Sequence, residues 1–224
     1  MRRFSTVALL SSTLAVAPAF AQEGGFYAGA DLGAVISAET DQDYVPGSTV
    51  GSTGNISTDH EIGLTGSAFV GYRFGAIRVE AEAGYLSADI DGLTSNFILP
   101  GGVTGSQSSI GEVSAQTFMA NATVDVGQFS DFTFFVGGGA GVAKLKVSEM
   151  TSSTGTIVLD DESDWKSAWQ ASIGVRKPLA TNIDLQVRYR YFDVDDAEMT
   201  GFGGRTVTAG LTAHSIVGGV TFNF

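Results

Sequence analysis

The chain contains no cysteine, which excludes disulfide bonds and thiolate metal sites. After the first 21 residues no apolar run approaches the ~18 residues of a membrane-spanning helix, because the longest, residues 134–143, stops after ten and contains glycines. Basic residues are scarce, with 12 Lys and Arg against 24 Asp and Glu, and the net charge of −12 disfavours a nucleic-acid partner. Proline is also scarce at 4, whereas glycine is abundant at 30. This composition fits a β-barrel.

Residues 1–21 are typical of a secretory signal peptide. Two arginines at positions 2 and 3 precede an apolar stretch that is too short for a membrane anchor, and small residues precede the expected cleavage between Ala21 and Gln22. The mature domain is therefore predicted to span residues 22–224. We expect the chain to be exported from the cytoplasm.

Eight segments of the mature domain place apolar residues at every second position, which is the period of a β-strand with one apolar face. The predicted strands are 25–36, 61–74, 77–88, 113–127, 132–146, 165–178, 183–193 and 211–224. Short turns at 75–76, 127–131 and 179–182 alternate with long, polar and largely acidic connections at 37–60, 89–112, 147–164 and 194–210. Each strand reaches the ~9–11 residues that cross a bilayer. The pattern predicts an all-β fold, an eight-stranded antiparallel up-and-down transmembrane β-barrel.

The two faces of the predicted strands differ in charge. The apolar face carries no Asp, Glu, Lys or Arg, and the opposite face carries five acids and five arginines: Asp31, Arg73, Arg78, Glu80, Glu82, Asp125, Arg176, Asp184, Arg188 and Arg190. A soluble barrel would show the reverse arrangement, so the charged face is predicted to line the lumen. Because unpaired buried charges are costly, these groups should form a salt-bridged plug, with inward glycines making room for the arginines.

Several segments resemble the small eight-stranded outer-membrane proteins of the opacity/OmpA-type β-barrel superfamily. The resemblance covers nearly all of the mature chain, and its carriers are residues 25–33, 69–74, 78–85, 135–141, 188–192 and 218–224. It implies a monomeric protein of the Gram-negative outer membrane (cell envelope) that contacts lipid and lipopolysaccharide. It also implies that Phe222 and Phe224 form a signal for the outer-membrane insertion machinery. The expected role is structural or one of surface interaction, namely membrane integrity or adhesion through four acidic extracellular loops, with no cofactor and no enzymatic activity.

Two alternative functions stay open. A narrow ion or small-solute pore would require the lumen charges to rearrange. A lipid-modifying enzyme would require a histidine beside a serine and a carboxylate. His214 and Ser215 are adjacent on a strand and point to opposite faces, whereas His60 lies near Asp59 at a junction of loop and strand.

The acidic stretches 160–162 and 193–196 lack EF-hand spacing, so no defined metal site is predicted.

Overall fold

The computed structural model describes the backbone of residues 24–44, 54–60, 63–99, 103–147, 150–151, 157–159, 162–201 and 205–224. Side-chain burial is described within 24–38, 63–88, 114–146, 165–195 and 210–224. The predicted signal peptide and the Ala21–Gln22 cleavage point lie outside the described residues. Among those residues, no helix is both long enough and apolar enough to span a membrane.

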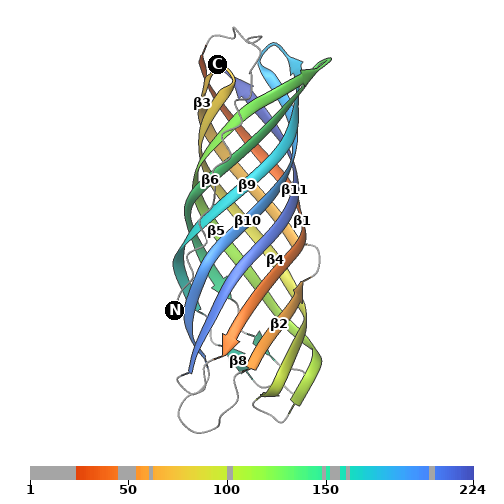
Figure 1. Ribbon diagram of the computed structural model, residues 1–224, viewed down its shortest axis with the longest axis vertical. Helices are drawn as coiled ribbons and strands as arrows, with labels where there is room; N and C mark the ends of the chain where they lie inside the picture. Colours follow the sequence, from red (N-terminus) through yellow and green to blue (C-terminus); the bar gives the residue numbers. More distant parts are fainter. Residues whose placement is uncertain are drawn as a thin grey trace, which may run out of the picture.

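Eight long strands of the described chain close into an antiparallel barrel (Figure 1). They are β1 (Gly25–Tyr44), β3 (Gly63–Phe74), β4 (Ile77–Leu99), β5 (Val103–Phe129), β6 (Phe132–Val147), β9 (Glu162–Ala180), β10 (Ile183–Gly201) and β11 (Arg205–Asn223). Each strand pairs with its neighbours in sequence, and β1 pairs with β11 to complete the ring. The predicted fold class is confirmed.

The prediction of four long irregular connections is wrong in large part, because strand pairing continues into them. β4 and β5 stay paired as far as Leu99 and Val103, across the expected loop 89–112. A further strand, β2 (Gly54–His60), pairs with both β1 and β4, and β7 (Met150–Thr151) pairs with β8 (Ile157–Leu159). Antiparallel pairing satisfies backbone groups in water as well as in lipid. The sequence of these extensions has no sustained alternation of apolar and polar residues, so this pattern did not reveal them.

The three predicted short turns are confirmed and are tighter than expected at two places. The turns occupy 75–76, 130–131 and 181–182, between β3 and β4, β5 and β6, and β9 and β10. Gly75 has a φ of +61°, a conformation that glycine adopts without a steric penalty. We call the end of the barrel that carries these turns the short-turn end, and the opposite end the loop end. β1 begins and β11 finishes at the short-turn end.

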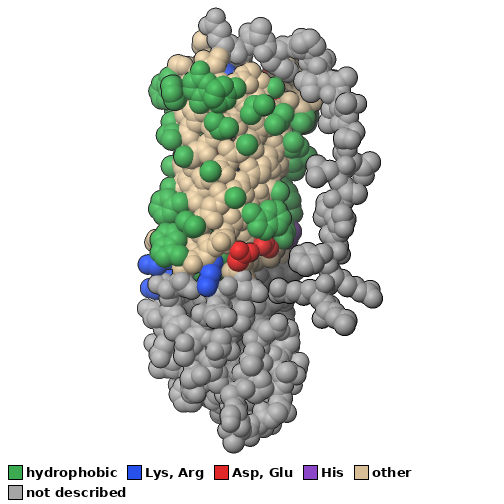
Figure 2. Space-filling model, turned by 60° about the vertical axis from the view of Figure 1, so that its left-hand side comes forward, with side chains coloured by type: hydrophobic (Ala, Val, Ile, Leu, Met, Phe, Trp, Pro, Cys, Tyr) green, Lys and Arg blue, Asp and Glu red, His purple; other side chains and the backbone are tan. Residues whose placement is uncertain are grey.

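The outer surface of the described barrel is apolar, as predicted. Large hydrophobic side chains are exposed on every long strand, among them Phe26, Leu32, Leu64, Val79, Phe118, Val136, Ile173, Val187 and Ile216. Figure 2 shows hydrophobic side chains gathered near both ends of the visible wall, with charged groups mainly at the loop-end rim. Water would not favour so much exposed apolar surface, whereas lipid does. Ile62, also expected on this face, lies outside the described residues.

Candidate functional site: the barrel lumen

The middle of the lumen holds two arginines from β10 and three carboxylates from β1 and β4. Arg188 forms a close ion pair with Asp31, and its guanidinium also lies 3.5 Å from Glu82 Oε2 and 4.0 Å from Glu80 Oε2. Arg190 lies 3.2 Å from Glu82 Oε1 and 3.6 Å from Asp31 Oδ2. All five are at most 6% exposed. These residues, which we call the central network, bring together half of the ten predicted lumen charges.

Neutral polar side chains donate hydrogen bonds to each of these carboxylates, although Glu80 Oε2 and Glu82 Oε1 accept none from the described residues. The Tyr27 hydroxyl donates to Glu80 over 3.0 Å, and the Gln186 amide donates to Asp31 over 2.9 Å. Asn121 donates to Glu82 over 3.0 Å and accepts a 2.7 Å bond from Gln170. Because a buried carboxylate is costly without such donors, these bonds help to fix the network in one arrangement.

Aromatic rings inside the lumen lie against several arginines, a contact that the pattern of charges did not predict. The guanidinium carbon of Arg176 lies 4.6 Å from the centre of the Phe135 ring, and that of Arg78 lies 5.3 Å from the Tyr27 ring. Arg188 lies 5.8 Å from the Phe69 ring. Cation–π attraction and ring area both favour these positions. Each ring residue is an odd number of positions from the lipid-facing residues of its strand. Alternation therefore places the rings on the inward, charged face, and this signal could have identified them.

The inward glycines make room mainly for these rings and for polar groups, rather than for arginines alone. A Cβ at Gly71 would lie 2.5 Å from Tyr27 Cζ, and one at Gly174 would lie 2.6 Å from Phe135 Cζ. These inward positions therefore lack room for a side chain, as expected. The groups that fill the space differ from the expectation.

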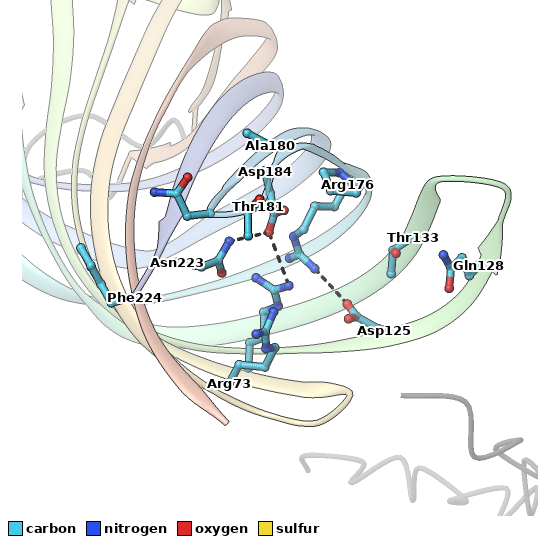
Figure 3. Close-up of a pocket in the computed structure, with 13 residues that line it drawn as sticks. Arg73, Asp125, Gln128, Thr133, Arg176, Ala180, Thr181, Asp184, Asn223 and Phe224 are labelled. Carbon is cyan, nitrogen blue, oxygen red and sulfur yellow. Dashed lines mark hydrogen bonds and ion pairs between the residues drawn. The ribbon is translucent and has the colours of Figure 1, made fainter. Parts of the chain in front are cut away.

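The other five predicted charges gather around a cavity of about 500 Å³ at the short-turn end, which we call the vestibule (Figure 3). Arg176 forms a 3.0 Å ion pair with Asp125, and Arg78 lies 3.9 Å from Asp184 Oδ2. Arg73 also lines the cavity, but it has no ion pair within 4.0 Å with any described carboxylate. The expected pairing of five acids with five arginines is incomplete in the described part of the chain.

Towards the loop end the lumen changes from ionic to apolar. Twelve inward residues form a buried hydrophobic cluster, which we call the apolar layer: Val35, Ala38, Leu86, Ala115, Met119, Ala143, Leu145, Ala168, Phe192, Val194, Leu211 and Ala213. Each of the eight long strands except β3 contributes at least one of them. The charges that predict the inward face do not indicate this layer, because its residues are all apolar.

The described histidine lies on the outer wall. His214 hydrogen-bonds Tyr189, and its ring lies edge-on to the Tyr191 ring, with centres 5.1 Å apart. Ser215 is buried on the lumen side, at 2% exposure, as the parity argument expected. The side chain of His60 lies outside the described residues. Among the described residues, no group of three or more His, Asp or Glu could hold a metal ion.

The end of β11 presents its aromatic residues outward. Phe222 and Phe224, the expected insertion signal, are 46% and 84% exposed. The Phe224 amide donates a 3.0 Å hydrogen bond to the Phe26 carbonyl, so the final residue is still joined to the first strand.

Comparisons with known proteins agree with this architecture. A family model described as "outer membrane protein beta-barrel domain" matches residues 6–224. Uncharacterized proteins of Brucella abortus and Brucella suis are 28% identical over 148 residues, covering 59% of this chain and 52% of theirs. The chain thus spans about half the length of the curated relatives that it matches.

Two solved structures share the fold. The outer membrane protein OprG from Pseudomonas aeruginosa aligns with a TM-score of 0.53 at 14% identity, covering 89% of this chain and 96% of OprG. The outer membrane protease OmpT from Escherichia coli aligns at 0.51 and 10% identity, covering 93% of this chain and 99% of OmpT. Identities this low show the fold alone. The family match covers nearly the whole sequence, and the chain therefore belongs to the outer membrane protein beta-barrel domain family and is a protein of the Gram-negative outer membrane.

Proposed function

We propose that this protein is a closed barrel with a structural or surface-contact role, rather than a channel or an enzyme. The observation that carries the proposal is the filled lumen, in which the central network and the apolar layer lie one above the other along the barrel axis. An eight-stranded barrel is narrow enough for side chains to fill it. Here they do so with two chemically opposite layers.

The two layers would oppose the same ion in different ways. An ion in the apolar layer would lose its water without gaining a partner, and hydrophobic constrictions of this kind exclude water and ions. An ion in the central network would have to separate carboxylates and guanidiniums that are buried and bonded to each other. The pore alternative therefore needs two independent rearrangements.

The acidic loop end is the surface that we propose for contacts. Short turns of outer-membrane barrels face the periplasm and longer connections face outward. On this rule the termini are periplasmic, and most of the surplus acids of the chain, including those at 39–43, 160–162 and 193–198, face the exterior. Lipopolysaccharide, with divalent ions bridging its phosphates to these acids, is the proposed neighbour, and a monomer is the proposed state.

The enzyme alternative receives no support from the described side chains. His214 bonds a tyrosine on the outer wall, whereas its neighbour Ser215 is buried in the lumen. The described part of the wall thus offers no histidine positioned to activate a serine. The enzyme alternative would therefore depend on His60, whose side chain lies outside the described residues.

A conductance measurement tests the closed lumen. Purified protein inserted into planar bilayers should give no discrete current steps at 200 mV in molar salt, because both layers must open for ions to pass. A gel shift on heating, measured on the same reconstituted sample, controls for the presence of folded barrel. Regular steps that scale with the amount of folded protein would contradict the closed lumen and favour the pore.

A second experiment tests the proposed insertion signal. Phe224→Ser should lower the fraction of protein that reaches the outer membrane in cells, because it removes the terminal aromatic that the insertion machinery is proposed to recognise. Phe74→Ser is the matched control, since Phe74 is an exposed aromatic at the same end of the barrel. Both variants should refold equally well into liposomes that lack the machinery. An equal loss in cells for the two variants would contradict a specific role for Phe224.

A further inference from the structure

Among the side chains that line the vestibule, arginines outnumber carboxylates. Three arginine side chains, Arg73, Arg78 and Arg176, line it together with two carboxylate side chains, Asp125 and Asp184. The remaining side chains of the lining are neutral, including those of Gln128, Thr133 and Asn223. Phe224, which carries the final main-chain carboxylate of the sequence, also lines the cavity. Figure 3 shows Arg176, Asp125 and Asp184 reaching into one space, with Arg73 beside them.

Arg78 is the most unusual of these groups. Its residue is 4% exposed, and its Nε, like that of the other four lumen arginines, is buried without a hydrogen-bond partner among the described residues. The nearest carboxylate oxygen, Asp184 Oδ2, lies 3.9 Å away and already accepts a 3.1 Å bond from Asn223. A buried guanidinium whose nearest carboxylate oxygen lies beyond hydrogen-bond distance is costly, so a group that supplies acceptor oxygens would stabilise Arg78 here.

Arg73 adds a second cation at the same place. Arg73 and Arg78 are directly opposite each other in the β3–β4 pairing, on either side of the Gly75 turn. Like charges opposite each other destabilise a sheet unless something lies between them. The Arg73 Nε is buried and has no partner either. Asp125 cannot compensate fully, because it is engaged with Arg176 at 3.0 Å.

We propose that the vestibule is an oxyanion-binding site, in which Arg73 and Arg78 hold one phosphate-type group between them. Arginine forks match the oxygen pairs of such groups and form charge-assisted hydrogen bonds with them. The cavity is open at the short-turn end, so the group can enter from the solvent or from the adjacent membrane surface. Free phosphate and a phospholipid headgroup share this chemistry.

The direct experiment uses inorganic phosphate as the probe. Folded protein in a zwitterionic, phosphate-free detergent is titrated with phosphate at constant ionic strength, and the arginine side-chain ¹⁵Nε signals are followed by NMR. The signals of Arg73 and Arg78 should shift and saturate. Arg73→Gln should weaken the binding about tenfold or more, because it removes a charge-assisted contact. Arg73 is half-buried at the mouth, so this variant should retain the heat shift of the folded barrel.

Lys177→Gln is the matched control. Lys177 also lies near the short-turn end, but it is exposed and its ammonium lies over the Phe132 ring, 5.1 Å from the centre, outside the vestibule. This variant removes the same charge and should leave phosphate affinity unchanged. If the two substitutions weakened phosphate binding equally, the binding would reflect only a general attraction to positive charge at the short-turn end. That result would overturn the proposal. A wild-type protein that shows no saturable shift would overturn it as well.

A second arm distinguishes the sources of the anion. The phosphate titration is repeated in nanodiscs of phosphatidylcholine alone and in nanodiscs that contain phosphatidylglycerol. If free phosphate is the ligand, the titration is the same in both. If a lipid headgroup occupies the vestibule, the arginine signals in the nanodiscs are already shifted from their positions in detergent before phosphate is added. Phosphate then changes them little. Arg73→Gln should reduce the shift of the Arg78 signal, whichever ligand causes it, and an undiminished shift in that variant would contradict the assignment.

Discussion

Arg188→Met should lower the free energy of unfolding by about 3–5 kcal/mol, because it removes one partner of a buried ionic group. Arg188 is 4% exposed and lies within 4.0 Å of Asp31, Glu80 and Glu82. After the substitution, Arg190 remains the partner of Asp31 and Glu82, whereas Glu80 has no ion pair left with a described arginine. Unfolding in urea, followed by tryptophan fluorescence and by the heat-dependent gel shift, measures the change.

A double substitution separates lost pairing from lost packing. The central network has two arginines and three carboxylates, so it has one negative charge in excess. The variant Arg188→Met with Asp31→Asn keeps this excess, because Arg190, Glu80 and Glu82 are the charged groups that remain. The double variant should therefore be more stable than the sum of the two single changes predicts, by about 1–3 kcal/mol, since contacting charges are coupled. Additive losses would indicate that Arg188 contributes mainly through its contact with the Phe69 ring.

The wall of the barrel could be predicted from the sequence because lipid imposes a simple rule on it. Each strand must turn one uniform face outward, so residues such as Leu32 and Val79 appear at every second position, and a window of ten residues suffices to detect them. The same parity placed Asp31 and Arg188 inside. Closure between β1 and β11 followed from the need to leave no strand edge in lipid.

The contacts inside the lumen could not be predicted in the same way. Asp31 and Arg188 are 157 residues apart, and their meeting depends on the stagger of eight strands rather than on any local pattern. The apolar layer was missed because residues such as Phe192 share the parity of the charges and differ only in height along the axis. Alternation along a strand determines which face a residue lies on. The stagger between strands determines how far along the barrel axis the residue lies, and therefore which residues it contacts.

Gly219→Ala should also be strongly destabilising, by about 3 kcal/mol, because it overpacks the lumen at the central network. A Cβ on Gly219 would fall inside contact distance of Asp31 Oδ1 and 3.0 Å from the Ala30 carbonyl oxygen. The backbone of the paired strand β1 cannot move away, so the carboxylate of Asp31 would have to shift. Its ion pair with Arg188 and its 2.9 Å bond from Gln186 would then be strained.

The neighbouring glycine provides a control with the same backbone. Gly218 is on the outward face of the same strand, and a Cβ there would come no closer than 4.0 Å to another described group, the Gln186 carbonyl. Gly218→Ala should leave the urea midpoint almost unchanged, or raise it slightly, because alanine restricts the unfolded chain more than glycine does. Equal losses for the two variants would mean that β11 requires glycine for its backbone. A loss at Gly219 alone would show that the missing side chain creates the space in which Asp31 meets its arginines.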